Sequence, residues 1–483
     1  MITMKIKSLV ESTIALFLLL TSLFANAQDS SIQVVKEFNL GEKIGFLRAV
    51  PVNISANERG MLFIHSADKS IDPWMEMFYV PTDRLKFTLY DMNGNLLWQK
   101  IHHKGVLNGE WFVPVFPFDL DQDGSDEIYF VHNTDSIHII SYFSQRLEAL
   151  DVKTGNTTGQ WPWKHVEVKN LMHRNFIFGG YDNGEPVLIT AQGTYFSMGL
   201  QAWSKGMEQK WELRIDENDP GARGSHMCPV VDINNDGIDE IFWGERCISI
   251  ASGEHLFIAD EKEYNGHSDV IQPTLNHNTG KWSIFTCRET GENGEIRPRV
   301  VMFDDKGQRV WTDLEYGHMD MGWTAHISEN QTIAFTISRG EKVSGPDGFY
   351  RKDVKEYAYN AATGEKIQLQ FNAYNSVPVD LNGDGFHEFA VALGEQADRK
   401  IYEYNGNELG YLGKDATIAI ASNFMGLNGE QLLCYYPDGS IKIWADTKAR
   451  PGKRAKLRYS NPYYKLMQRF TAVGYNLVEL GGL

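Results

Sequence analysis

Short runs of alternating apolar and polar residues, each interrupted by a tight polar turn, recur along most of the chain. An aromatic or aliphatic run leads into a turn of Asp, Asn and Gly, and a second run follows that often ends in Trp. Four clear copies are LYDMNGNLLW (89–98), ALDVKTGNTTGQW (149–161), AWSKGMEQKW (202–211) and MFDDKGQRVW (302–311), and four weaker copies are ISIASGEHLF, YNAATGEKIQL, YEYNGNELGYL and YYPDGSIKIW. Alternation with a period of two across a glycine-containing turn predicts β-hairpins.

The spacing of these eight hairpins predicts the architecture. They follow one another at intervals of about 33 to 60 residues, and no helical periodicity lies between them. A repeat of this length built from hairpins is typical of a β-propeller, in which four-stranded antiparallel blades stack around a channel because no blade can bury its own faces. We therefore predict an all-β propeller with eight blades, or with seven if one weak copy is not a blade.

Three further stretches place acidic and amide side chains at alternate positions before a glycine and a short strand. They are FDLDQDGSDEIYFV (118–131), VDINNDGIDEIFWGER (231–246) and VDLNGDGFHEFAVA (379–392). This is the front half of an EF-hand loop, but the second copy has Trp243 where an EF-hand needs a glutamate at position twelve. We predict structural calcium in strand-to-strand turns, with a metal-free turn as the alternative. The predicted ligands are Asp119, Asp121, Asp123, Asp232, Asn234, Asp236, Asp380, Asn382 and Asp384.

The two ends of the chain depart from the repeat. Residues 1–27 contain two lysines, a short apolar run and the sequence Ala-Asn-Ala at their end, which predicts a secretory signal peptide. Residues 446–483 are basic and aromatic, and we predict that they pack on the propeller, which spans 28–445, instead of forming a solvated tail. The protein is thus expected in the periplasm or outside the cell, with no other segment able to span a bilayer.

Composition limits the partners. The 483-residue chain has a net charge of −17, which argues against nucleic acid because phosphate binding requires a basic surface. An anionic substrate remains compatible with a locally basic pocket, since much of the acidity lies in the Asp-rich loops. Four cysteines are too few for a disulfide framework, although Cys228 and Cys247 flank the second loop and either pair or stay as buried thiols. We expect a monomer.

Histidine, tyrosine and arginine gather in short segments outside these loops, such as LMHRNF (171–176), GARGSHM (221–227) and YGHMDMGW (316–323). No nucleophile elbow, P-loop or Rossmann glycine motif is present, and the paired carboxylates of a glycosidase remain an alternative. The set suits β-elimination on a uronic-acid polysaccharide. In that reaction a cation or an arginine neutralises the uronate carboxylate, and a histidine or tyrosine removes the C5 proton.

Several segments also resemble motifs of known enzymes. GHSDVIQP, RPRVVMFDDKGQRVW and GHMDMGW, with HRNF…ITAQGTY and the tail NPYY…VGYN, resemble the rhamnogalacturonan lyases of polysaccharide lyase family eleven, which are calcium-binding β-propellers. The GHSD segment lacks the second histidine of that family, and in this the chain is more similar to the propeller ulvan lyases of marine bacteria. The resemblance implies an exported lyase acting on ulvan, with rhamnogalacturonan as the alternative. The sulfate of ulvan would require further basic residues, which are supplied by Arg223, Arg288, Arg297, Arg299 and the tail.

The resemblance and the clusters together nominate site residues. The catalytic candidates are His173, Tyr195, His226 and Arg246. The substrate-binding candidates are Arg174, Asn175, Gln192, Arg223, Tyr264 and His318. His173 would be the general base or acid, with Tyr195 or His226 as its partner. Arg246 would neutralise the uronate, with Arg174 as its substitute. Some relatives carry a basic residue in place of Gln192, so the second member of the catalytic pair stays open.

Zinc is a second candidate metal. His267, His277 and Cys287 are ligand types on neighbouring predicted strands, with buried structural side chains as the alternative. Among functions, a non-catalytic binding propeller is the main rival, because Asp-rich loops of this kind also occur in adhesion propellers. A quinone-dependent dehydrogenase fits less well, since no tryptophan docking motif repeats at a strict period.

Overall fold

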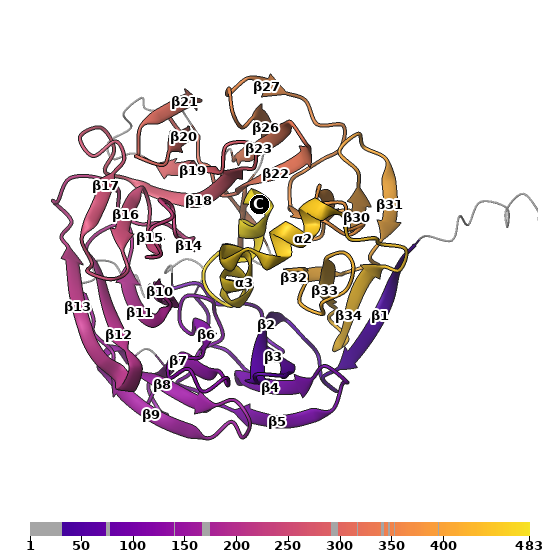
Figure 1. The fold of residues 1–483 in the computed structure, drawn as a ribbon. Helices are drawn as coiled ribbons and strands as arrows, with labels where there is room; N and C mark the ends of the chain where they lie inside the picture. The colour runs from indigo at the N-terminus through magenta and orange to yellow at the C-terminus, as the bar shows by residue number, and fades with distance from the viewer. Residues whose placement is uncertain are drawn as a thin grey trace, which may run out of the picture.

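The chain folds into a ring of blades around a central channel (Figure 1). The structure, a computed structural model, describes residues 31–73, 78–139, 141–166, 174–290, 298–315, 317–339, 342–345, 348–351, 353–394 and 396–483. Within these ranges it contains eight four-stranded antiparallel sheets and one two-stranded hairpin. The prediction of an eight-bladed β-propeller is confirmed.

The blades follow the order of the chain, and each is built from four strands. In sequence order they are β2 (Phe46–Ser55), β3 (Glu58–Ser66), β4 (Lys86–Asp91) and β5 (Leu96–Ile101); β6 (Val115–Phe118), β7 (Glu127–Asn133), β8 (Gln145–Asp151) and β9 (Thr157–Pro162); β10 (Asn175–Asp182), β11 (Glu185–Gly193), β12 (Met198–Ser204) and β13 (Glu208–Ile215); β14 (Val230–Val231), β15 (Glu240–Phe242), β16 (Arg246–Ser249) and β17 (His255–Ile258). The next are β18 (His267–Asn276), β19 (Lys281–Thr290), β20 (Val300–Asp304) and β21 (Arg309–Asp313); β22 (Gly322–Ser328), β23 (Gln331–Ser338), β26 (Lys355–Asn360) and β27 (Lys366–Ile367); β28 (Ser376–Val379), β29 (Glu388–Val391), β30 (Lys400–Tyr402) and β31 (Glu408–Tyr411). The last blade contains β32 (Thr417–Ser422), β33 (Gln431–Tyr435), β34 (Ser440–Asp446) and β1 (Ile32–Asn39), and the separate hairpin pairs β24 (Lys342–Gly345) with β25 (Gly348–Arg351).

The last blade closes the ring by combining both ends of the chain. Its outer strand, β1, pairs antiparallel with β34 from Ile32 opposite Asp446 to Asn39 opposite Ser440. Joining the first and last strands in one sheet ties the first blade to the eighth, so the ring has no open seam.

The tryptophans that end the hairpin motifs join neighbouring blades. Trp98 Nε1 donates to the Val152 carbonyl at 2.8 Å, and a Cβ at Gly155 would meet the Trp98 ring at 2.8 Å. The same arrangement recurs for Trp211 with Ile250 and Gly253, and for Trp311 with Ala361 and Gly364. Each ring therefore covers the hairpin turn of the next blade, and only a glycine in that turn leaves room for it.

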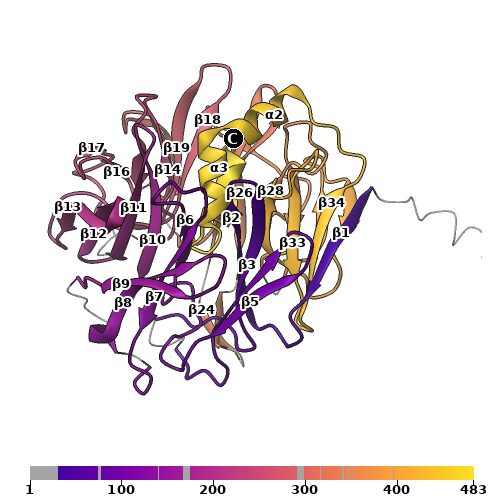
Figure 2. The ribbon, with the colours of Figure 1, turned by 60° about the horizontal axis from the view of Figure 1, so that its bottom comes forward.

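The C-terminal segment fills the middle of the ring. It contains α2 (Lys453–Ser460), α3 (Pro462–Met467) and 3₁₀ turns at Gln468–Phe470 and Asn476–Gly482, with two more such turns in the blades at Tyr142–Ser144 and Lys205–Met207. Figure 1 shows α2 and α3 over the middle of the ring, and Figure 2 shows α2 at one end of it. Gln272 Nε2 on β18 donates to two carbonyls of this segment, those of Val478 at 3.1 Å and Glu479 at 3.0 Å. The boundaries predicted at residues 27 and 445 stay predictions, and the predicted signal peptide lies outside the described residues.

The structure also bears on the disulfide considered between Cys228 and Cys247 and on membrane-spanning helices. All four cysteines, Cys228, Cys247, Cys287 and Cys434, are free buried thiols, so the pair considered between Cys228 and Cys247 is not formed. None of the helices in the described part of the chain has the length and apolar composition needed to cross a bilayer.

Candidate functional site

A cavity of about 830 Å³ opens where several blades and the C-terminal segment meet. The start of β2, the loops that follow β3, β9 and β11, and residues 471–478 all contribute to its wall. Its polar lining is formed by Arg48, Asp72, Glu110, Arg174, Tyr195, His226, Asp269, Glu289, His318, Asp320, Arg339 and Tyr475. Volumes of this size are typical of ligand sites, and titratable groups dominate the polar part of the wall.

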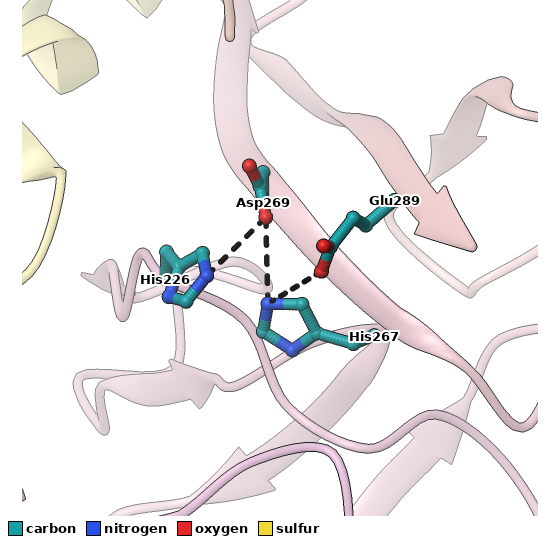
Figure 3. Close-up of side chains that lie close together, drawn as sticks. All are labelled: His226, His267, Asp269 and Glu289. Carbon is teal, nitrogen blue, oxygen red and sulfur yellow. Dashed lines mark ion pairs between the residues drawn. The ribbon is translucent and has the colours of Figure 1, made fainter. Parts of the chain in front are cut away.

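Two histidines and two carboxylates converge here (Figure 3), and three of them, His226, Asp269 and Glu289, line the cavity. Asp269 Oδ1 lies 3.4 Å from both His226 Nε2 and His267 Nε2, and His267 Nε2 lies 3.9 Å from Glu289 Oε2. One nitrogen or oxygen from each of the four side chains lies within 4.8 Å of all the others. We call these four residues the His226 cluster.

Irregular strand pairing presents both carboxylates of the His226 cluster. In the β18–β19 ladder His267 lies opposite Thr290, Ser268 opposite Arg288 and Val270 opposite Cys287, with a register shift on each side of Ser268. Asp269 and Glu289 are the residues that this ladder skips. Such bulges re-aim side chains and are frequent beside active sites.

The His226 cluster has the chemistry of a divalent-cation site. His267 Nε2, Asp269 Oδ1 and Glu289 Oε2 are buried and have no hydrogen-bond partner among the described residues, and all three face the same point. Burial, and then the charges of Glu289 and Asp320, raise the pKa of Asp269 well above its ordinary value. Imidazole nitrogen together with carboxylate oxygen binds zinc, manganese or related ions. A cation at this point would satisfy all three atoms and relieve the repulsion between the carboxylates.

A strained loop fixes the tautomer of His267. Gly193, Thr194 and Tyr195 have φ values of 116°, 124° and 71°, a conformation that is costly outside glycine. The Thr194 hydroxyl donates to the Arg223 carbonyl at 3.0 Å and lies 2.5 Å from His267 Nδ1. Since the hydroxyl has only one proton, it must accept from Nδ1–H. The lone pair of His267 therefore resides on Nε2, which faces the cluster.

Tyr195 and Arg174 stand beside the cluster in the same cavity. The Tyr195 hydroxyl lies 3.2 Å from His226 Nε2, and its ring centroid lies 4.2 Å from that of His267. The Arg174 guanidinium stacks on Trp111 at 4.5 Å, lies 5.8 Å from the Tyr195 ring and bonds Asp72 at 3.1 Å. Burial raises the pKa of Tyr195, and the charge of Arg174 opposes that rise.

His318 is held between two carboxylates on the other side of Glu289. Its Nε2 lies 2.8 Å from Glu289 Oε1, and its Nδ1 contacts Asp320, which also pairs with Arg339 at 3.0 Å. Although burial opposes it, hydrogen bonding to Asp320 and Glu289 raises the pKa of His318 to about 9. The imidazolium and Arg339 therefore add positive charge to the cavity wall.

The three Asp-rich loops share one local geometry. In the second loop Asp232 accepts from the amides of Asp236 and Gly237 at 3.0 Å each, and the first loop repeats both contacts through Asp119. In the third loop Asp380 accepts from Gly385 N at 3.1 Å. The oxygens of Asp119, Asp121 and Asp123 lie close enough to share one ion.

A glutamate that the sequence argument overlooked stands at the ninth position of each loop, where an EF-hand also places a ligand. Glu127, Glu240 and Glu388 each accept from a backbone amide of their own loop, at 3.2, 3.0 and 2.8 Å. Burial, and then the aspartates of the same loops, raise the pKa of Glu127 to about 7 and that of Glu240 to about 8. A bound cation would offset this accumulation of charge.

Known proteins resemble this chain in sequence and in fold. No family model matches the sequence. The rhamnogalacturonan exolyase YesX of Bacillus subtilis (strain 168) is 23% identical over 312 residues, covering 54% of this chain and 50% of YesX, so the match spans about half the length of that relative. The resemblance to rhamnogalacturonan lyases is confirmed.

Solved structures show the same likeness along nearly the whole chain. The exotype lyase YesX matches with a TM-score of 0.72 and 18% identity, covering 92% of this chain and 81% of that one. Rhamnogalacturonan lyase PL11 of Bacillus licheniformis gives 0.70 and 17%, covering 93% and 81%, and YesW gives 0.70 and 16%, covering 94% and 81%. At these identities the likeness shows a shared fold.

Only some of the predicted catalytic residues line the cavity. Tyr195 and His226 lie together in the cavity, whereas His173 lies outside the described residues. Arg246 is only 2% exposed and does not line the cavity. Its guanidinium donates to the Ala222 carbonyl at 2.7 Å and to that of Pro220, and it contacts His255. The prediction that Arg246 neutralises the uronate is therefore corrected. Its N–H donors are bound to carbonyls of the loop between β13 and β14 and hold that loop in place.

The predicted substrate-binding residues divide in the same way. Arg174 and His318 line the cavity, and the other four do not. Asn175 and Gln192 bond each other at 2.7 Å across the β10–β11 pair. The Arg223 guanidinium bonds carbonyls of its own loop at Glu217, Asp219 and Gly221, and the Tyr264 hydroxyl donates to the His267 carbonyl at 2.5 Å. These four residues support the backbone of the site.

The predicted zinc set is not brought together. His267 begins β18 and His277 follows its end, and ten residues of extended strand span roughly 33 Å. Cys287 is a buried free thiol on β19, opposite Val270. Only His267 belongs to a ligand cluster, in company with residues that the prediction did not include.

Sequence reasoning missed Asp269, Glu289 and Asp320, together with Arg48, Arg339 and Trp111. Asp269 could have been found, because a residue two positions after His267 on one strand projects to the same face. Asp320 stands at the same spacing after His318. Glu289 carried no comparable signal, since its approach depends on the register of two strands.

Proposed function

We propose that this protein is a polysaccharide lyase that cleaves a uronic-acid-containing polymer by β-elimination. The observation that carries the proposal is the convergence, in one cavity, of the His226 cluster, the Tyr195 hydroxyl and the Arg174 guanidinium. The rhamnogalacturonan lyases with the same fold support it. We further propose export by the predicted signal peptide and action as a monomer.

Rhamnogalacturonan is the preferred substrate in this proposal. The prediction of ulvan required further basic residues for its sulfate groups, and four arginines and the basic tail were named for this role. Arg288 is instead fully buried, with two bonds to Glu245 at 2.8 and 2.6 Å, and Arg223 is occupied by backbone carbonyls. Arg299 does not line the cavity, and Arg297 lies outside the described residues. The relatives named above are rhamnogalacturonan lyases, so ulvan becomes the comparison substrate.

The uronate carboxylate has to be neutralised before C5 can lose its proton. Arg174 projects from the loop before β10 and is oriented by Asp72 and by the face of Trp111, so its remaining donor edge is pre-organised for an anion. Burial acts to lower the pKa of Arg174, but the charges of Tyr195 and Asp72 outweigh it and raise that pKa. The guanidinium therefore stays cationic. A divalent cation held by the His226 cluster would withdraw further charge from the same carboxylate when bound.

Tyr195 is the group that we assign to proton transfer. Its hydroxyl first gives its proton to His226 Nε2, 3.2 Å away. The resulting phenolate oxygen takes the proton from C5, the C4–C5 double bond forms, and the bond from C4 to the glycosidic oxygen breaks. The re-formed hydroxyl then gives this proton to the leaving oxygen, and His226 returns its proton to the phenolate. Arg174 beside the ring stabilises the transient phenolate.

The test is the ultraviolet absorbance of the unsaturated uronate released from rhamnogalacturonan and, separately, from ulvan, with calcium or manganese present. The polymer that gives the rise identifies the substrate. Tyr195→Phe should lower kcat by about 10² to 10⁴-fold, the usual contribution of acid–base catalysis, whereas Tyr411→Phe on an outer strand should be neutral. No rise on either polymer would favour a non-catalytic binding propeller instead.

A further inference from the structure

A second cavity, of about 400 Å³, lies at the other end of the channel-facing strands and carries an unusual charge. Its wall contains three cations, Arg59, Lys465 and Arg469, in a chain whose net charge is −17. The rest of the wall is formed by Pro51, Asn53, Tyr181, Pro462, Leu466 and Gln468. We call it the distal cavity.

The distal cavity is separate from the catalytic one. On β2 the catalytic cavity is lined by residues up to Arg48, and the distal cavity by Pro51 and Asn53. Five residues of extended strand between Arg48 and Asn53 span roughly 16 Å. The segment between α3 and Gly474 passes between the two, because Arg469 lines the distal wall and Thr471 lines the catalytic wall.

Two of the three cations form no direct ion pair with a described residue, although the buried Asp126 lies near enough to Arg59 to act on its charge. Arg469 pairs with the buried Asp126 at 2.7 Å and donates to the Pro117 carbonyl at 3.1 Å. Arg59 makes one long bond of 3.4 Å to the Phe424 carbonyl, and neither it nor Lys465 forms an ion pair with any residue in the described ranges. Cations that merely offset the acidic loops would be paired as Arg469 is. The other two leave positive charge directed at an open cavity.

The remaining lining has the character of a sugar site. Tyr181 is 37% exposed, so its ring offers an apolar surface on which the C–H face of a pyranose can pack. Asn53 and Gln468 bring amide groups to the same wall. A volume of about 400 Å³ lies within the range of roughly 300 to 1,000 Å³ that small-molecule sites occupy. Cations, an exposed aromatic ring and amides together match a sugar that carries an oxyanion.

We propose that the distal cavity is a second, non-catalytic binding site for an acidic sugar unit of the polymer. The polymer as substrate rests on the proposed function above. Arg59 and Lys465 bind the carboxylate or sulfate of that unit, and Tyr181 packs against its ring. A second contact on one polymer chain raises the effective concentration of the enzyme on its substrate without taking part in the chemistry.

The test is isothermal titration calorimetry on the Tyr195→Phe protein, in which turnover is strongly slowed. The probes are a galacturonate trimer, the same trimer with its carboxyl groups reduced to alcohols, and inorganic sulfate. We expect two binding sites for the acidic trimer. In the Arg59→Gln/Lys465→Gln background one of them should be lost or weakened by about tenfold per cation removed, as bonds to charged groups usually are.

Matched controls separate a local from a general charge effect. Lys306→Gln/Lys414→Gln removes two exposed cations, one in the β20–β21 hairpin turn and one in the connection from β31 to β32, and should leave both sites intact. Arg59→Lys keeps the charge and should retain most of the affinity. Melting temperatures verify that each variant is folded. Initial rates of the Arg59→Gln/Lys465→Gln protein on short oligosaccharides, with Tyr195 restored, should equal those of the wild type.

Several outcomes would overturn the proposal. It fails if the double variant keeps both sites, if the reduced trimer binds as tightly as the acidic one, or if sulfate alone binds as tightly as the trimer, which would indicate a simple anion site. Binding is measured independently of turnover. If no polymer is cleaved but the distal affinity depends on Arg59 and Lys465, the proposed enzymatic function fails and the binding site stands.

Discussion

Gly474→Ala should disable the active site without touching any proposed catalytic group. Gly474 has a φ of 48°, and a Cβ added there would lie 2.2 Å from the His226 carbonyl oxygen. The next residue, Tyr475, donates its backbone N–H to the same oxygen at 2.9 Å and places its ring 4.9 Å from the His226 ring. The C-terminal segment thus holds His226 in position through contacts with its backbone carbonyl and its ring.

The size of the effect follows from this contact. Real Cβ atoms essentially never approach a neighbour closer than 3.0 Å, so the Gly474 segment and His226 must separate by the difference between 3.0 and 2.2 Å. The neighbour is a backbone atom of a packed segment, which cannot yield as a long side chain would. Displacing a reacting or metal-binding group by about 1 Å costs roughly 10²-fold in rate. We therefore expect kcat to fall about 10²-fold, with weaker metal binding at the His226 cluster.

Gly426→Ala is the matched control. Gly426 has a φ of 69° and no atom within 4 Å of its Cβ position. Both substitutions strain a left-handed backbone by about 1 to 2 kcal/mol, but only one of them displaces His226. Initial rates, together with terbium luminescence excited through Trp111, whose ring centroid lies 4.7 Å from that of His226, report activity and metal affinity separately. The reasoning is refuted if Gly474→Ala is indistinguishable from Gly426→Ala in both assays.

Three further predictions concern charge. Arg174→Gln should lower kcat/KM by roughly ten- to a hundredfold, because a bond to the substrate carboxylate is lost. Arg246→Lys should instead lower the melting temperature and leave kcat of the folded protein unchanged. Equal losses of kcat in the two variants would contradict this assignment. Chelation of calcium should lower the melting temperature, since the loops would lose the cation that offsets their carboxylates, and Asp232→Ala should reduce the response measured by calorimetry. Burial, and then the charge of His132, lowers the pKa of His102 from 6.5 to about 3, so its contribution to stability is complete above pH 6.5 and declines as the pH falls toward 3. At pH 5 the loss is about 2 kcal/mol, and His102→Phe should therefore show a shallower fall in melting temperature between pH 7 and pH 5 than the wild type.

Part of the site was readable from residue types and short spacings. Tyr195 and His226 were predicted as alternative partners of His173, and in the structure their own side chains lie 3.2 Å apart. The aspartate of the GHSD segment could have been assigned to the face of His267 from strand periodicity. Arg246 shows where this reasoning failed, because an arginine beside a histidine-rich segment has the right chemistry in any surroundings. Which way its guanidinium points depends on the carbonyls of another loop.

The sequence by itself determined the features whose causes are local. A hairpin with alternating residues, a turn glycine and a terminal Trp forms and joins the next blade through groups that all lie inside the repeat, so eight copies were enough to predict eight blades. The Asp-rich loops are likewise complete within nine residues. The tertiary structure alone decided which side chains form the site. Glu289 meets His267 because the β18–β19 ladder skips one residue on each strand, and residues 471–478 form part of the cavity wall because the chain returns through the channel. Register and chain return depend on packing between distant segments, which no local pattern records.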